Sequence, residues 1–129
     1  MLNKMANEAR KSIIKMIYEA KSGHPGGSLS CIDILMYLYQ KELKLTKDNI
    51  NSNERNKLVL SKGHGAPALY AVLKEMKVLG EKELMTFRKI NSSLQGHPNM
   101  NDTKGVDMST GSLGQGISAA VGITLANKY

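Results

Sequence analysis

Four glycine-rich segments divide this chain and limit how it can fold. They are residues 22–28 (SGHPGGS), 61–65 (SKGHG), 95–98 (QGHP) and 110–116 (TGSLGQG). Glycine permits backbone angles that other residues avoid, and proline has no amide hydrogen to donate inside a helix. We therefore expect a helix to end where the first of these segments begins, and all four segments to form loops between regular elements.

The three histidines of the chain all lie in these segments, and each directly follows a glycine. They are His24, His64 and His97. A single loop histidine usually bonds to backbone, but three on glycine-lined loops favour a shared cleft in which imidazoles donate and accept protons near neutral pH. A three-histidine metal site is the weaker alternative, because their spacing fits no compact metal motif.

Apolar residues recur at helical spacing between the glycine segments. The second helix has one charged residue, Asp33, between positions 31 and 39, so we expect it to be buried on all sides, with Cys31 as a small core residue. The pattern predicts helices over residues 6–21, from an N-cap at Ser30 onward, after Pro67 in the first turn, over residues 81–90, and from the last glycine segment to Lys128.

Two short apolar runs are typical of buried strands. Residues 58–60 (LVL) lead into the second glycine segment, and residues 106–108 (VDM) lead into the fourth. Alternating strands, helices and glycine turns indicate an α/β fold. We therefore expect residues 1–129 to form one helix-rich α/β domain with a short parallel sheet, incomplete at the C-terminus because no strand follows the last helix.

The last helix carries small residues at four-residue steps: Gly114, Ser118, Gly122 and Ala126. Glycine inside a helix costs about 1 kcal/mol relative to alanine, so a close neighbour must compensate. We expect tight packing within the domain, with a subunit interface as the alternative.

The glycine run at residues 111–116 precedes that helix, and the amides at a helix start attract negative charge. Its spacing matches no established phosphate-binding motif, so a plain turn is an equal alternative. Lys62 adds a positive charge at the end of the first expected strand, where ligands of open α/β sheets gather. Asp102 and Asp107 are interpreted as loop and turn residues.

Composition excludes several classes of protein. The net charge is +7, but no run of five Lys or Arg residues exists and aromatic residues are only 5%, so nucleic-acid binding is disfavoured, and phosphorylated small molecules match the charge equally well. One cysteine excludes an internal disulfide. No apolar run approaches the ~20 residues of a membrane span and no signal peptide is visible, so we expect a cytoplasmic protein without membrane contact.

The four glycine segments, in this order and at this spacing, resemble those of transketolases. The resemblance covers essentially the whole chain and is to the N-terminal, thiamine-diphosphate-binding domain. Ser112 stands where long single-chain members usually carry proline. In this the chain is similar to the split type, which has separate N- and C-terminal subunits.

The resemblance implies a reaction and two catalytic residues. Transketolases use thiamine diphosphate to move a two-carbon ketol unit between phosphosugars, and the cofactor carries the difficult chemistry. His24 matches the family histidine that contacts substrate and assists proton transfer. His97 matches the one that bonds a hydroxyl of the donor sugar and the reaction intermediate.

The resemblance also implies cofactor contacts. His64 matches the histidine near the cofactor's diphosphate, while Gly111, Ser112 and Leu113 match the backbone segment that touches the cofactor. The family's metal segment, a Gly-Asp-Gly run that holds Mg²⁺ or Ca²⁺ in the complete enzyme, would begin just after Tyr129. We therefore expect no metal ligand within these residues.

These implications leave two hypotheses open. In the first, the chain is part of a transketolase and needs further sequence or a pyrimidine-binding C-terminal subunit or domain for activity. In the second, it is a non-catalytic truncated paralogue that serves as an interaction module. In both, we expect a homo-oligomer, because an incomplete sheet would leave an edge uncovered.

Overall fold

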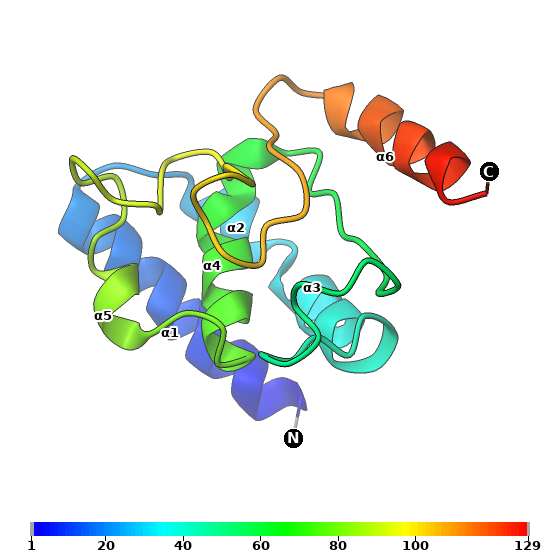
Figure 1. Cartoon of the computed structure of the whole chain (residues 1–129). Coiled ribbons are helices and arrows are strands. Elements are labelled where there is room, and N and C mark those ends of the chain that lie inside the picture. Colours follow the sequence, from blue (N-terminus) through cyan, green and yellow to red (C-terminus); the bar gives the residue numbers. More distant parts are fainter. Residues whose placement is uncertain (1, 129) are drawn as a thin grey trace.

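A computed structural model describes residues 2–128, and it consists mainly of helices packed around a central helix (Figure 1). A π-helical turn at Leu38–Glu42 and a 3₁₀ turn at Gly63–Gly65 add to the α-helices. In chain order the α-helices are α1 (Leu2–Ala20), α2 (Pro25–Leu29), α3 (Ile32–Tyr37), α4 (Ala66–Glu75), α5 (Glu81–Leu84) and α6 (Gln115–Ala126).

The central helix is α4, which is buried along most of its length. Residues 66–73 are all buried, and α4 packs against α1, α3 and α5. Pro67 lies in its first turn, as predicted, where its missing amide hydrogen costs nothing. α1 presents Ala9, Ile13 and Met16 to this core at three- and four-residue spacing.

The first glycine segment is more helical than predicted. α1 ends at Ala20, but Pro25 starts the short helix α2 within the segment. The fixed φ of proline favours this helix start. The predicted N-cap at Ser30 is wrong: Ser30 closes α2 through a backbone bond to the carbonyl of Gly26, and Cys31, which is only partly buried, is the residue before α3.

The expectation that the second predicted helix is buried on all sides is also wrong. In α3, Ile34 and Tyr37 are 64% and 49% exposed, while Ile32, Leu35 and Met36 are buried. α3 contacts α1 and α4 on its inner face only. Its composition is apolar throughout, but its position in the fold leaves one face outside the core.

No strand occurs among residues 2–128, so the predicted short parallel sheet is not observed in the described part of the chain. The two expected strand segments nevertheless lie side by side. The amide of Leu58 donates a 2.8 Å hydrogen bond to the Asp107 carboxylate, and the hydroxyl of Thr110 donates one of 2.7 Å to the carbonyl of Leu60. Side chains thus make the bonds that a strand ladder would otherwise supply.

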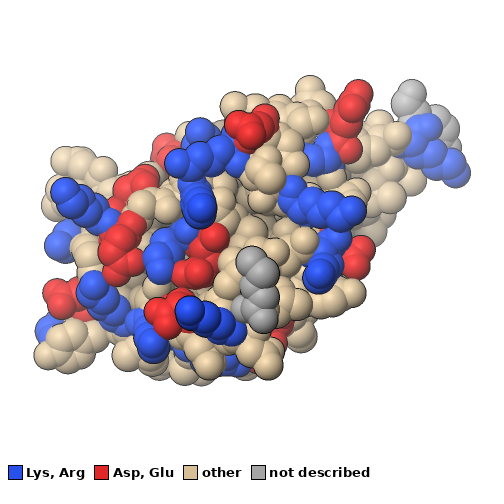
Figure 2. Space-filling model, turned by 90° about the horizontal axis from the view of Figure 1, so that it is seen from below, with Lys and Arg blue, Asp and Glu red and all other residues tan. Residues whose placement is uncertain are grey.

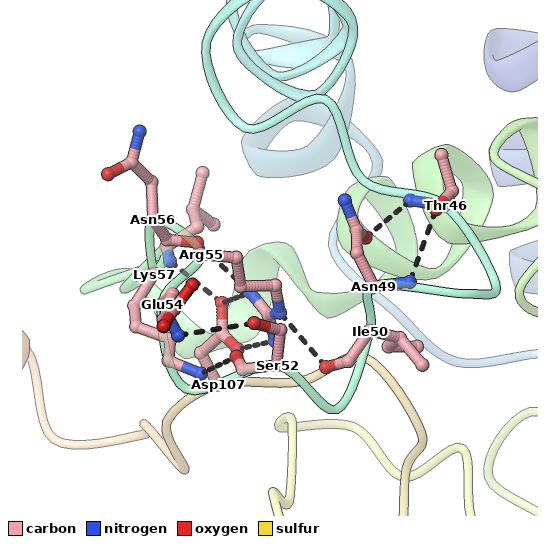
Figure 3. Close-up of polar contacts among 10 residues, drawn as sticks. Thr46, Asn49, Ile50, Ser52, Glu54, Arg55, Asn56, Lys57 and Asp107 are labelled. Atoms are coloured by element: carbon pink, nitrogen blue, oxygen red, sulfur yellow. Dashed lines mark hydrogen bonds and ion pairs between the residues drawn. The ribbon is translucent and has the colours of Figure 1, made fainter.

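A buried ion pair joins these segments (Figure 3). Both guanidinium ends of Arg55 bind the carboxylate of Asp107, and the side chains are 8% and 4% exposed. Arg55 also donates hydrogen bonds to the carbonyls of Ile50 and Asn56. The guanidinium thus donates four hydrogen bonds, two of them to its counter-charge, and these offset the cost of burying the pair.

The last two predicted helices differ from expectation in extent and packing. α5 ends at Leu84 rather than Ile90. α6 extends away from the body (Figure 1), and Gly116 is its one buried residue among those described. A Cβ on Gly122 would meet no atom within 4 Å. The predicted tight packing of the small-residue face is therefore absent from the described residues.

None of the helices formed by residues 2–128 combines the length and the apolar character that crossing a membrane requires.

Candidate functional site

Thr110 joins three of the glycine segments. Its hydroxyl donates to the carbonyl of Leu60, directly before the segment of His64, and its amide donates a 3.4 Å hydrogen bond to the carbonyl of Pro98, directly after His97. The start of the fourth segment is thereby fixed against the second and the third.

Gly63 brings the second and fourth segments into direct backbone contact. A Cβ on Gly63 would lie 2.5 Å from the carbonyl oxygen of Thr110 and 2.9 Å from the amide nitrogen of Gly111. Real Cβ atoms do not approach backbone this closely, so this contact requires glycine.

The first and second segments meet through their histidines. The rings of His24 and His64 pack edge to face, with centroids 5.3 Å apart and planes at 64°. Gly27 permits this contact, because a Cβ there would lie 3.0 Å from Nε2 of His64.

Lys62 fastens the same two segments together. Its ammonium donates a 2.6 Å hydrogen bond to the carbonyl of Gly27 and a 3.2 Å bond to the hydroxyl of Ser30. The positive charge predicted at the end of the first strand segment therefore lies beside α2, next to the paired imidazoles.

His97 is held through its backbone. The buried hydroxyl of Tyr70 donates a 2.9 Å hydrogen bond to the carbonyl of Gln95 and a 3.4 Å bond to that of His97. Burial raises the pKa of Tyr70 to about 12, so the hydroxyl keeps its proton and remains a donor at neutral pH. The ring of His97 lies beside Gly111, 3.6 Å from where a Cβ would be.

The three imidazoles are available to a ligand. His24 and His97 are exposed and His64 is half-buried. Within residues 2–128, none of the three rings makes a hydrogen bond or ion pair with another side chain or with backbone. Buried groups fix the loops, while the imidazole nitrogens make no hydrogen bond within the described residues. This is typical of histidines that bind a ligand or transfer protons, and less so of histidines with a purely structural role.

The fourth segment offers open backbone next to these rings. Gly111 is half-buried, whereas Ser112 and Leu113 are exposed. Gly114 then adopts the left-handed conformation, with φ of 88°, directly before α6. Residues 108–112 and the start of α6 line a hollow of about 270 Å³. The chain thus places free amides at a helix start beside a hollow, an arrangement suited to an anionic group.

Four residues that support this site were not expected to do so from the sequence. Thr110, Tyr70, Arg55 and Asp107 hold the loops, whereas the sequence alone indicates only a turn residue at Asp107. Its place between Val106 and Met108 is a usable signal, because a carboxylate in an apolar run requires a buried partner. Tyr70 gives no comparable signal, since its hydroxyl acts on a loop far along the chain.

Among the described residues, no group of three His, Cys, Asp or Glu side chains is arranged to hold a metal ion.

Comparison with known families identifies the chain. Residues 1–129 match the model of the transketolase, thiamine diphosphate binding domain. The chain belongs to the transketolase family. The resemblance of the four glycine segments is therefore confirmed, together with the family's thiamine-diphosphate-binding type of domain.

Similar curated proteins are named as transketolases or as transketolase subunits. The chain is 46% identical over 125 residues to the 6-deoxy-6-sulfo-D-fructose transketolase subunit SqwG of a Clostridium species, covering 97% of the chain and 46% of that protein. It is 35% identical over 127 residues to an apulose-4-phosphate transketolase subunit of Phocaeicola vulgatus, covering 98% and 45%. Human transketolase is 41% identical over 128 residues, covering 99% and 20%.

Solved structures show the same fold. Transketolase from Leishmania mexicana superposes with a TM-score of 0.88 at 34% identity, covering 95% of this chain and 18% of that one. The Campylobacter jejuni enzyme gives 0.84 at 38% identity, covering 94% and 19%. The chain thus spans about half the length of the split-subunit relatives and about a fifth of the long ones.

Proposed function

We propose that this chain supplies part of the active site of a transketolase that transfers a two-carbon ketol unit between phosphosugars. The observation that carries the proposal is the meeting of four separate loops around free imidazoles and an open helix start. Activity requires further sequence or a second subunit, because the chain spans about half the length of relatives that are themselves named as subunits.

The fourth glycine segment, together with the loop of His64, suits the diphosphate group of thiamine diphosphate. Gly63 lets the second segment touch the backbone of Thr110, and beyond Thr110 the residue Gly111 is half-buried while Ser112 and Leu113 are exposed. His64 directly follows Gly63, so its loop lies against this backbone. When bound, the cofactor supplies the electron sink for the transferred two-carbon unit. Mg²⁺ or Ca²⁺ would be held by residues outside this chain.

His24 and His97 are the proposed catalytic residues. Both rings are exposed and make no hydrogen bond or ion pair within the described chain, so each can accept a proton from a sugar hydroxyl and return it. His24 packs against His64 on the cofactor side, whereas His97 lies against Gly111. The two therefore approach a substrate from different loops.

Charge supports anionic small-molecule substrates rather than nucleic acid. The net charge is +7, yet on the face drawn in Figure 2 basic side chains alternate with acidic ones. Nucleic-acid binding usually needs a continuous basic stripe. A modest positive excess suits sugar phosphates and a diphosphate.

α6 is the proposed contact with another subunit. Its apolar residues Ile117, Val121 and Leu125 are 66%, 54% and 52% exposed, and they line an open groove between α6 and Val59. Two relatives are named as subunits, which supports a pyrimidine-binding partner as well as self-association. Light scattering of the chain at high concentration should show an oligomer that Val121→Asp dissociates. A native chain that stays monomeric would count against self-association.

Thiamine diphosphate binding tests the proposal directly. We expect thiamine diphosphate with Mg²⁺ to move the NMR signals of His64 and of Gly111–Leu113, and to raise the melting temperature by mass action. Thiamine without its diphosphate is the matched control and should have a much smaller effect. If neither the chain alone nor the chain with a pyrimidine-binding subunit responds to the cofactor, the chain takes no part in catalysis.

The remaining alternative is a non-catalytic interaction module, which the exposed face of α6 favours. It predicts binding of a partner subunit without any cofactor response. The same cofactor titration therefore separates the two functions.

A further inference from the structure

Arg88 lies between the loops that carry His24 and His97, although it belongs to neither glycine segment. Its Nη1 donates a 2.9 Å hydrogen bond to the hydroxyl of Ser22, two residues before His24. On the other side, a Cβ on Gly96 would lie 2.7 Å from Nη2 and 2.8 Å from Cζ of Arg88. One guanidinium thus contacts both loops.

The backbone of Arg88 is in an unfavourable conformation. Its φ is 61°, in the left-handed region that long side chains rarely adopt. The amide still makes a 2.8 Å hydrogen bond to the carbonyl of Leu94, which closes the turn. Lys21, Lys44 and Lys77 adopt the same region, so this conformation shapes the turn and does not by itself mark a functional site.

The guanidinium of Arg88 is confined. Its Nε is buried and has no hydrogen-bond partner among residues 2–128. Nε lies 3.0 Å from where a Cβ on Gly96 would be, and Cζ lies 5.6 Å from the ring centre of Phe87. A flexible surface arginine would turn toward water, whereas this one stays wedged against the loop of His97.

We propose that Arg88 is a positioning residue that sets the separation of the His24 and His97 loops. It acts through Ser22 on one side and through the backbone of Gly96 on the other. The inference rests on the proposed function, since the two imidazoles matter to catalysis only if that function holds. The coupling between the loops is nevertheless a property of this chain and needs no cofactor to be measured.

A double-mutant cycle read by NMR tests the coupling. The imidazole signals of His24 and His97 are recorded in the native chain, in Gly96→Ala, in Arg88→Ala and in the double variant. The added methyl at position 96 displaces the guanidinium, which is the movable end of a flexible side chain. We expect Gly96→Ala to shift the signals of His24 in the native background and to leave them unchanged in the Arg88→Ala background.

Two results would overturn the inference. One is a His24 signal that Gly96→Ala leaves in place while Arg88 is present. The other is an equal shift in both backgrounds, which would mean that the loops communicate without Arg88. If Arg88 had a purely structural role, Arg88→Ala would lower the melting temperature, and Gly96→Ala would still shift the His24 signals in that background.

Control variants test whether the effect is specific to Arg88. Arg10→Ala removes another arginine, one paired with Asp33 on the outer surface, and should leave all histidine signals in place. If Arg88→Ala does not fold, Arg88→Lys retains the charge but loses the planar fork, and the cycle is measured in that background. A normal cofactor response with no coupling would refute the role of Arg88 alone, while intact coupling without a cofactor response would refute the proposed function alone.

Discussion

A Cβ atom on Gly63 would lie 2.5 Å from the carbonyl oxygen of Thr110, so two segments far apart in sequence touch through bare backbone. The hydroxyl of Thr110 donates to Leu60 in the same region. Together these contacts fix the loop of His64 against the open helix start, so the shape of the site depends on them.

Gly63→Ala should therefore force these two segments apart. The methyl meets backbone, which cannot move aside as a side chain can, so we expect a loss of about 1–3 kcal/mol in the free energy of unfolding. Denaturant unfolding measures the loss, and cofactor binding should weaken with it.

Gly122→Ala is the matched control for that variant. No atom lies within 4 Å of the added methyl, and the position is inside α6. Alanine is preferred over glycine in a helix by about 1 kcal/mol, so the variant should be as stable as the native chain or more so. Equal destabilisation by both variants would contradict the close-contact explanation.

Asp107→Asn should destabilise the chain strongly. The substitution leaves the guanidinium of Arg55 buried without a counter-charge, which costs about 3–5 kcal/mol. It also weakens the bond from the amide of Leu58. Unfolding in urea measures the change.

Asp33→Asn is the control, because Asp33 pairs with Arg10 where the two side chains are 68% and 35% exposed. Exposed pairs contribute little, so this change should be nearly silent. Similar midpoints for the two variants would show that the buried pair is not what joins the strand segments.

Local pattern was enough to predict the positions of α1 and α4, because apolar periodicity is written in neighbouring residues. The exposure of Ile34 and the short extent of α5 depend on what packs against them, which no local pattern contains. The predicted strands are absent from the described residues: their segments lie side by side, but the Asp107 side chain makes a bond that a strand ladder would otherwise supply. The spacing of apolar residues gives no sign that a side-chain hydrogen bond replaces a backbone one.

His97→Ala should leave stability almost unchanged. The ring is exposed and makes no hydrogen bond within residues 2–128, while the loop is held by its backbone through Tyr70. We expect a melting temperature close to native and, in an assembled enzyme, a large loss of turnover. A parallel fall of both would assign His97 a structural role.

Tyr70→Phe should change the alkaline limit of stability. Below pH 10 the hydroxyl is protonated in both the folded and unfolded chain, so its hydrogen bonds contribute fully. Burial raises the folded pKa to about 12 from an ordinary value of 10.0, so between these values the unfolded chain loses its proton first and stability falls with rising pH. The buried Tyr39, whose pKa burial also raises, adds to the fall.

The phenylalanine variant separates these two contributions. Below pH 10 it should be less stable than the native chain by about 0.5–1.5 kcal/mol, because the carbonyls of Gln95 and His97 lose their donor. Between pH 10 and 12 its stability should fall less steeply, since Tyr39 alone remains of the pair. Urea unfolding at a series of pH values measures both the stability difference below pH 10 and the slope between pH 10 and 12. An unchanged slope would mean that the Tyr70 hydroxyl ionises as readily in the folded chain as in the unfolded one, and that the loop of His97 is held by something else.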